Sequence, residues 1–189
     1  MTAPLRWLMT LLLACAAGQA ALAQTVKLAT SMGDIVVQLD ADKAPKTVAN
    51  FVQYVKDGHY DGLIFHRVIG TFMIQGGGYD VDRRERATRA PIPLESRNGL
   101  SNRRGTIAMA RTSVPDSATS QFFINVVDNQ RLDAANSPDG NGYAVFGKVV
   151  SGLDVVDKIR EVPVGNRAGH QNVPQQPVVI RKATLESSK

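Results

Sequence analysis

Residues 65–77 read FHRVIGTFMIQGG and place one arginine and one glutamine inside two short apolar runs. We predict that these runs form two β-strands, Leu63–Ile69 and Phe72–Gln75, because short apolar runs are typical of strands with a buried face. The run Gly76-Gly77-Gly78 predicts a tight turn after the second strand. It lacks the lysine and the hydroxyl residue of a phosphate-binding loop.

Arg67 is the unusual residue of this stretch. Side chains alternate across a strand, so Phe65, Arg67 and Ile69 are expected on one face and His66 and Val68 on the other. Arg67 would then be buried or half-buried among apolar neighbours, where a cation is costly unless it is paired. A structural arginine with its stem on apolar surface is one explanation, and a functional arginine is the other.

Three blocks of sequence resemble the signature of the cyclophilins, the cyclosporin-binding family of peptidyl-prolyl isomerases. They are FHR at 65–67 with FMIQGG at 72–77, SQFFIN at 120–125 and VFGKV at 145–149. The resemblance covers nearly all of Val26–Thr184 and favours the functional arginine. It implies an all-β fold, a closed eight-stranded antiparallel barrel capped by two α-helices.

The periodicity of the chain agrees with many short strands and two helices. Apolar residues at helical spacing predict a helix from about Pro45 to Lys56, which ends at Asp57-Gly58, and a second one over Gly152–Arg160. Further strands are expected at Val26–Thr30, Ile35–Asp40, Thr106–Ala110, Gln121–Asn125, Tyr143–Val150 and Val178–Thr184.

The first 23 residues are interpreted as a secretory signal peptide. Arg6 is their only charge, Trp7–Ala17 is apolar, and Ala21-Leu22-Ala23 fits the small-x-small cleavage rule, which makes Gln24 the expected mature N-terminus. The sequence before Cys15 also resembles a bacterial lipoprotein box, so a lipid-anchored form is the alternative. We favour cleavage and expect a periplasmic protein with a single domain over residues 24–189.

Composition limits the other function classes. The only cysteine is Cys15, so a chain that begins at Gln24 has neither disulfides nor a thiolate nucleophile. Arginines concentrate between the expected strands, which could suggest nucleic-acid binding, but no recognition helix or aromatic RNA-binding signature accompanies them. We interpret them as a solvated loop. They are Arg83, Arg84, Arg86, Arg89, Arg97, Arg103 and Arg104.

The expected chemistry is rotation about the bond that precedes proline. That rotation is slow because the C–N bond has partial double-bond character, with a barrier of roughly 18–20 kcal/mol. The twisted state turns the prolyl nitrogen into a basic lone pair, so a catalyst needs a hydrogen-bond donor rather than a nucleophile. The resemblance assigns this role to Arg67, since a guanidinium only donates.

The resemblance also implies the remaining site residues. Phe72 and Gln75 join Arg67 as catalytic residues, with Gln75 bonded to a substrate carbonyl or orienting Arg67. Ala110 and Arg111 would present backbone groups to the peptide before proline, as an added strand does. The other substrate-binding residues are Met73, Phe123 and Leu132, which wall the proline pocket with Phe72, then Gln121 in the adjoining groove, and Tyr143.

No metal or cofactor is expected. His59, His66 and His170 show no spacing typical of metal ligands, and His66 is interpreted as a structural histidine on the face opposite Arg67. Nothing in the sequence indicates an oligomer, so a monomer is assumed.

Two positions depart from the well-known cytosolic cyclophilins. Arg131 stands where those proteins carry a tryptophan, and Tyr143 where they carry a histidine. The tryptophan is an important cyclosporin contact, so we expect weak cyclosporin binding with retained activity.

The main hypothesis is an exported peptidyl-prolyl cis–trans isomerase that acts on proline-containing, unfolded or partly folded exported proteins. The second hypothesis is a proline-binding chaperone or adaptor with the same groove and little turnover. A third, an envelope-surface binding protein, depends only on the basic loop.

Overall fold

The computed structural model describes residues 24–167 and 169–186. The predicted signal peptide and its cleavage site at Ala23 therefore lie outside the described residues. Within these two ranges, none of the helices has both the length and the apolar character needed to cross a bilayer.

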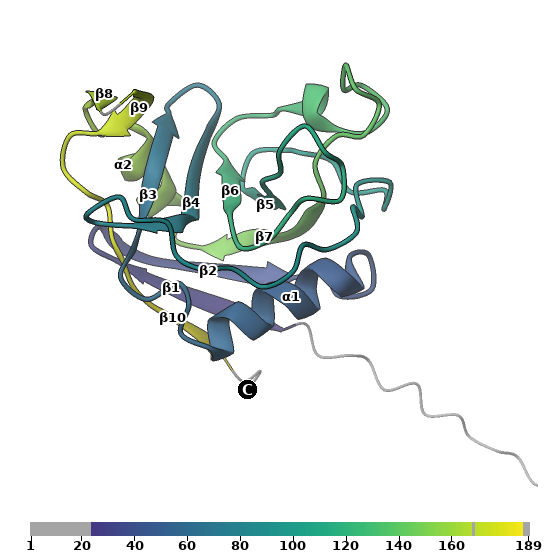
Figure 1. Cartoon of the computed structure of the whole chain (residues 1–189), viewed down its shortest axis with the longest axis horizontal. Helices are drawn as coiled ribbons and strands as arrows, with labels where there is room; N and C mark the ends of the chain where they lie inside the picture. Colours follow the sequence, from purple (N-terminus) through teal and green to yellow (C-terminus); the bar gives the residue numbers. More distant parts are fainter. Residues whose placement is uncertain (1–23, 168, 187–189) are drawn as a thin grey trace, which may run out of the picture.

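One antiparallel sheet of eight strands curls strongly around the core (Figure 1). Each neighbouring pair of strands runs antiparallel, and the two ends of the sheet are β10 and β3. In spatial order the strands are β10 (Ile180–Glu186), β1 (Thr25–Thr30), β2 (Gly33–Leu39), β7 (Val145–Ser151), β5 (Thr106–Met109), β6 (Phe122–Asn125), β4 (Met73–Asp80) and β3 (Leu63–Ile69).

The prediction of a mainly β fold with two helices is confirmed, but the prediction of a closed barrel is wrong. Between β3 and β10 the sheet is open and is crossed at a few points, one of which is an isolated bridge from Ile64 to Val179. The Phe65 N–H also donates to the Val178 carbonyl at 2.9 Å. The chain runs beside β3 only briefly before it pairs with β1, so no ladder forms at this seam.

Two helices complete the domain. Helix α1 (Pro45–Lys56) packs against β10, and α2 (Leu153–Arg160) packs against β2, β3 and β4. The ring of Phe51 enters the core from α1, with its centroid 5.6 Å from that of Phe122 and 5.1 Å from that of Phe146. The helical spacing predicted this buried face of α1 correctly.

The arginine-rich segment is tied to the domain rather than freely solvated. Its Glu95 accepts hydrogen bonds from the backbone N–H groups of Lys46 and Thr47 at 3.1 and 2.8 Å, which caps the first turn of α1. The N-cap residue of that helix, Ala44, has no side chain that could do so. Arg86 Nη1 donates to the carbonyl of His59 at 2.8 Å and fastens the same segment.

Two further differences from the predictions concern the glycine run and the C-terminal third. The run Gly76-Gly77-Gly78 is not a turn but lies inside β4. At Gly77, φ is 85° and an added Cβ would lie 2.9 Å from the Ser120 carbonyl oxygen, so this position requires glycine. A hairpin of β8 (Val164–Arg167) and β9 (His170–Pro174) was not predicted and packs beside β3.

Candidate active site

The position of Arg67 is set by a β-bulge. Phe65 pairs with Gly76 and Arg67 pairs with Gln75, so His66 is one extra residue on β3. The bulge breaks the strict alternation, and Phe65 and Val68 both face the main core. The predicted burial of Arg67 beside Phe65 is therefore wrong, because Arg67 is exposed and incurs no large desolvation cost.

A chain of side-chain hydrogen bonds crosses three strands or strand ends at this point. Arg67 Nη1 donates to Gln75 Oε1 at 3.4 Å, and Gln75 Nε2 donates to Gln121 Oε1 at 3.1 Å. Both functional groups of the Gln75 amide are therefore engaged, one by Arg67 and one by Gln121. Gln75 is placed to orient the guanidinium.

A cavity of about 170 Å³ opens beside Arg67, and all the predicted site residues except Gln121 line it. Its apolar wall belongs to a small cluster separate from the main core, with Met73 and Phe123 only 2% and 5% exposed. The full lining consists of Arg67, Phe72, Met73, Gln75, Ala110, Arg111, Phe123, Leu132 and Tyr143.

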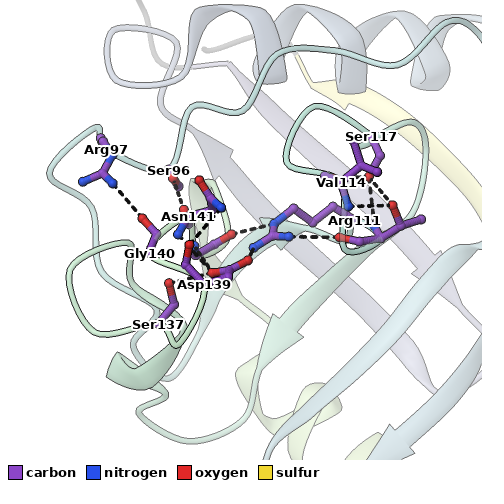
Figure 2. A network of polar contacts seen from close by, with 11 residues as sticks. Ser96, Arg97, Arg111, Val114, Ser117, Ser137, Asp139, Gly140 and Asn141 are labelled. Carbon is purple, nitrogen blue, oxygen red and sulfur yellow. Dashed lines mark hydrogen bonds and ion pairs between the residues drawn. The ribbon is translucent and has the colours of Figure 1, made fainter.

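Arg111 is part of the wall and is held in place by its own contacts (Figure 2). Its side chain is 3% exposed, its Nε donates to the Gly142 carbonyl at 2.8 Å, and its Nη2 forms an ion pair with Asp139. The guanidinium also lies 4.7 Å from the centre of the Tyr143 ring. Arg111 therefore joins the loop around Asp139 to the pocket and holds the Tyr143 ring in position.

Asp139 organises that loop from within. Its Oδ1 accepts hydrogen bonds from the backbone N–H groups of Asn141 at 3.0 Å and Gly142 at 3.2 Å. The N–H of Asn141, followed by the guanidinium of Arg111, lowers the pKa of this carboxyl below its usual value. The contribution of Asp139 to stability is present above the ordinary carboxyl pKa and is lost as the pH falls below it.

Buried amides that the sequence did not single out support the far wall. Leu132 lies in the short helix η1 (Gln130–Leu132), which follows Asn129. Asn129 Nδ2 donates to the Phe72 carbonyl and to Asn125 Oδ1, both at 2.8 Å. The available sequence signal was the polar Asn125 at the end of an apolar run, and the structure shows that this residue is fully buried.

Arg131 contacts Phe72, one of the residues that line the pocket. Its guanidinium lies 4.7 Å from the centre of the Phe72 ring. A cation therefore stacks on Phe72 at the position where the well-known cytosolic cyclophilins are expected to carry a tryptophan.

A second cavity of about 400 Å³ adjoins the first and shares Arg67 and Gln75 with it. Gln121 and His66 line this second cavity, so the prediction that His66 faces away from Arg67 is wrong. His66 is 8% exposed, and its ring centroid lies 4.9 Å from that of Tyr79. Burial, followed by the charges of Arg83, Arg67 and His170, lowers the pKa of His66 to about 4.

A larger cavity of about 530 Å³ lies at β2 and β7, and Asp40, Asp42 and Lys148 are among its lining residues. It contains none of the predicted site residues and no guanidinium, so size alone does not make it the site. Among residues 24–167 and 169–186, no group of three histidines or carboxylates could hold a metal ion.

A small cavity with one apolar wall and an exposed guanidinium beside it can accept an apolar group that lies next to a hydrogen-bond acceptor. Residues 25–185 match the family described as cyclophilin type peptidyl-prolyl cis-trans isomerase. The chain belongs to this family, as its three sequence blocks predicted, and it is a peptidyl-prolyl cis–trans isomerase.

Named relatives agree over almost their full length. A peptidyl-prolyl cis-trans isomerase of Streptomyces antibioticus is 57% identical over 162 residues, which cover 85% of this chain and 98% of the relative. Peptidyl-prolyl cis-trans isomerase B of Escherichia coli is 54% identical over 157 residues, covering 82% and 96%.

Solved structures give the same result for the fold. A cyclophilin-type isomerase of Cryptosporidium parvum superposes with a TM-score of 0.73 at 26% identity, over 88% of this chain and 99% of the other. A second structure of that protein, in the presence of the dipeptide Ala-Pro, superposes with a TM-score of 0.72 at 27% identity, over 87% and 100%.

Replacement of Arg111 by alanine is expected to lower the free energy of unfolding by about 2 kcal/mol, because it removes buried hydrogen bonds and an ion pair. Urea denaturation measures this. Arg97→Ala is the matched control, since Arg97 also donates to this loop, at the Gly140 carbonyl, but from an exposed side chain. Its expected effect is below about 0.5 kcal/mol. Equal losses in the two variants would contradict the anchoring role of Arg111.

Proposed function

We propose that this isomerase acts on X–Pro bonds of exported polypeptides and that Arg67 donates the hydrogen bond that stabilises the twisted state. The observation that carries this proposal is the guanidinium of Arg67 at the rim of the small cavity walled by Met73 and Phe123. A prolyl ring in that cavity would bring its nitrogen next to a group that only donates. A bond that strengthens as the amide twists lowers the barrier selectively.

Apolar walls add to the effect of Arg67. Phe72, Met73, Phe123 and Leu132 would surround the ring and exclude water from one side of the amide. In a drier environment the hydrogen bond to the prolyl nitrogen is stronger, and the planar amide loses solvation. The Cryptosporidium parvum relative studied with Ala-Pro supports a proline-sized ligand for this pocket.

Gln75 and Ala110 have narrower roles in this proposal than the sequence suggested. Gln75 orients Arg67 rather than binding a substrate carbonyl, since both ends of its amide are engaged by Arg67 and Gln121. The Ala110 N–H already donates to the Gln121 carbonyl at 2.9 Å. The backbone left for the substrate peptide is the Ala110 carbonyl and the Arg111 N–H.

The test of Arg67 is isomerisation of a short X–Pro peptide by the wild type and by Arg67→Ala. We expect kcat/KM to fall by roughly 10²–10³-fold, the usual effect of removing one donor to a transition state. Circular dichroism should show a folded variant, because Arg67 is exposed. Arg84→Ala, an exposed arginine outside the cavity, is the control and should keep full activity.

Two results would contradict this assignment in different ways. A folded Arg67→Ala variant with full activity would make Arg67 a structural residue. A wild type that binds the peptide without isomerising it would favour the proline-binding chaperone or adaptor.

Export is the second part of the proposal, and it depends on the signal-like sequence of residues 1–23. Expressed with its full sequence in a Gram-negative host, the protein should be recovered from the periplasm. Mass spectrometry should find a chain that begins at Gln24. A chain that keeps Met1, or one with a lipid on Cys15, would contradict cleavage at Ala23.

Weak cyclosporin binding is the third part, and it rests on Arg131, whose guanidinium stacks on Phe72. Replacement by tryptophan supplies an aromatic surface, so Arg131→Trp is expected to raise cyclosporin affinity by about tenfold, a gain of about 1.4 kcal/mol. Inhibition of peptide isomerisation measures it. Arg131→Ala removes the guanidinium without adding a ring, so it separates the effect of losing the cation from the effect of gaining the aromatic surface. Equal affinity of Arg131→Trp and the wild type would contradict the prediction.

A further inference from the structure

The cavity of about 400 Å³ beside the proline pocket has no role in the isomerisation described above. Its walls come from β3, β4, the segment after β4 and the start of β9. Arg67 and Gln75 separate it from the proline pocket and line both cavities. A polypeptide that placed its proline in one cavity would therefore pass the mouth of the other.

The charged side chains that line this cavity are the two guanidinium groups of Arg67 and Arg83, and no carboxylate occurs among its lining residues in the described part of the chain. His66 also lines it and is neutral near pH 7, because its pKa is lowered to about 4. Three carboxylates lie in the segment around Arg83, namely Asp80, Asp82 and Glu85, and the first two are engaged elsewhere. Asp80 accepts hydrogen bonds from the backbone of the segment that follows it, and Asp82 pairs with Arg84 at 3.3 Å.

Two buried polar atoms of these residues have no hydrogen-bond partner in the protein. They are His66 Nδ1 and Arg83 Nη1, and His59 Nε2 is the only other such side-chain atom in the described part of the chain. His66 is 8% exposed, so its nitrogen is largely withdrawn from water. Arg83 Nη1 is always a donor, an unpaired buried donor is costly, and a ligand that accepts its hydrogen bond removes that cost.

The backbone conformation of two lining residues also indicates a ligand site at this cavity. Arg83 and Asn172 have φ values of 63° and 58°, and within residues 24–167 and 169–186 they are the only non-glycine residues with positive φ. Both line this cavity, one from each side. A backbone conformation with positive φ is unfavourable for a residue with a side chain and tends to be retained at ligand sites. The Arg83 N–H donates to the Asp80 carbonyl at 3.0 Å, which holds the turn.

We propose that this cavity binds a carboxylate of the substrate polypeptide, an aspartate or glutamate side chain close to the isomerised proline. The inference rests on the proposed isomerase function and specifies its substrate class. Arg83 is the principal ligand, because it lines only this cavity, whereas Arg67 faces the proline pocket as well. A guanidinium and a carboxylate form charge-assisted, often bidentate, hydrogen bonds. The enzyme therefore prefers proline segments that carry an acidic neighbour.

The test compares peptides that carry glutamate or glutamine at each position near a constant X–Pro bond. At the position that reaches the cavity, kcat/KM should be roughly three- to tenfold higher for the glutamate peptide, the scale of a partly exposed ion pair. The ratio should fall toward one as salt is added, because salt screens the pair. Equal rates for the two peptides at every position would overturn the inference.

Arg83→Gln tests the assigned ligand. In this variant the ratio of kcat/KM for the glutamate peptide to that for the glutamine peptide is expected to fall toward one. Arg84→Gln is the matched control, since Arg84 is the exposed neighbour paired with Asp82, and its ratio should equal that of the wild type. Equal ratios in all three proteins would overturn the role of Arg83. If Arg83→Gln does not fold, the wild-type protein tests the inference instead. A kcat/KM ratio of the two peptides that does not fall as salt is added would then overturn it.

Two further results distinguish this inference from a free-anion site and from a failure of the proposed isomerase function. In one result, inorganic phosphate shifts the proton NMR signals of His66 and His170 in a saturable way, while kcat/KM is the same for the glutamate and the glutamine peptides. That result would assign the cavity to a free anion and overturn the substrate role. Absence of turnover with both peptides would instead count against the proposed isomerase function. Turnover of both at equal rates would leave that function intact and refute only the acidic preference.

Discussion

The bulge at His66 is the constraint on which the site depends. Without the extra residue, strict alternation would place Arg67 on the same side as Phe65, which is fully buried in the aromatic core. With it, Phe65 and Val68 both pack inward, while Arg67 is exposed and lines the second cavity together with His66. One irregular pair of residues thus lets a dense apolar core and a polar working surface share a single strand.

Several residues of the site are held in place by contacts within the protein. Arg111 fastens the Asp139 loop and the Tyr143 ring, and the buried amide of Asn129 holds Phe72. These contacts are made before any peptide arrives, so binding does not have to order them. In an enzyme that breaks no covalent bond, such preorganisation supplies much of the available catalytic effect.

Sequence reasoning found the strands and helices because their apolar periodicity is local. The sequence also predicted most of the residues that line the small cavity, among them Arg67 and Tyr143. That prediction came from the family resemblance rather than from periodicity. The closed barrel that the resemblance implied is wrong, because the chain around Val179 runs beside β3 too briefly to form a ladder there. The bulge at His66 is invisible to an alternation pattern, which reads the same with or without it.

The pairing of β1 with β10 has a consequence for synthesis. These strands are the first and the last of the described chain, and they lie side by side over most of their length (Figure 1). A ribosome releases β1 long before β10 exists, so this ladder can form only after the whole domain has emerged. Until then β1 lacks one of its two neighbours. The nascent chain therefore stays incompletely folded for the full time of its translation.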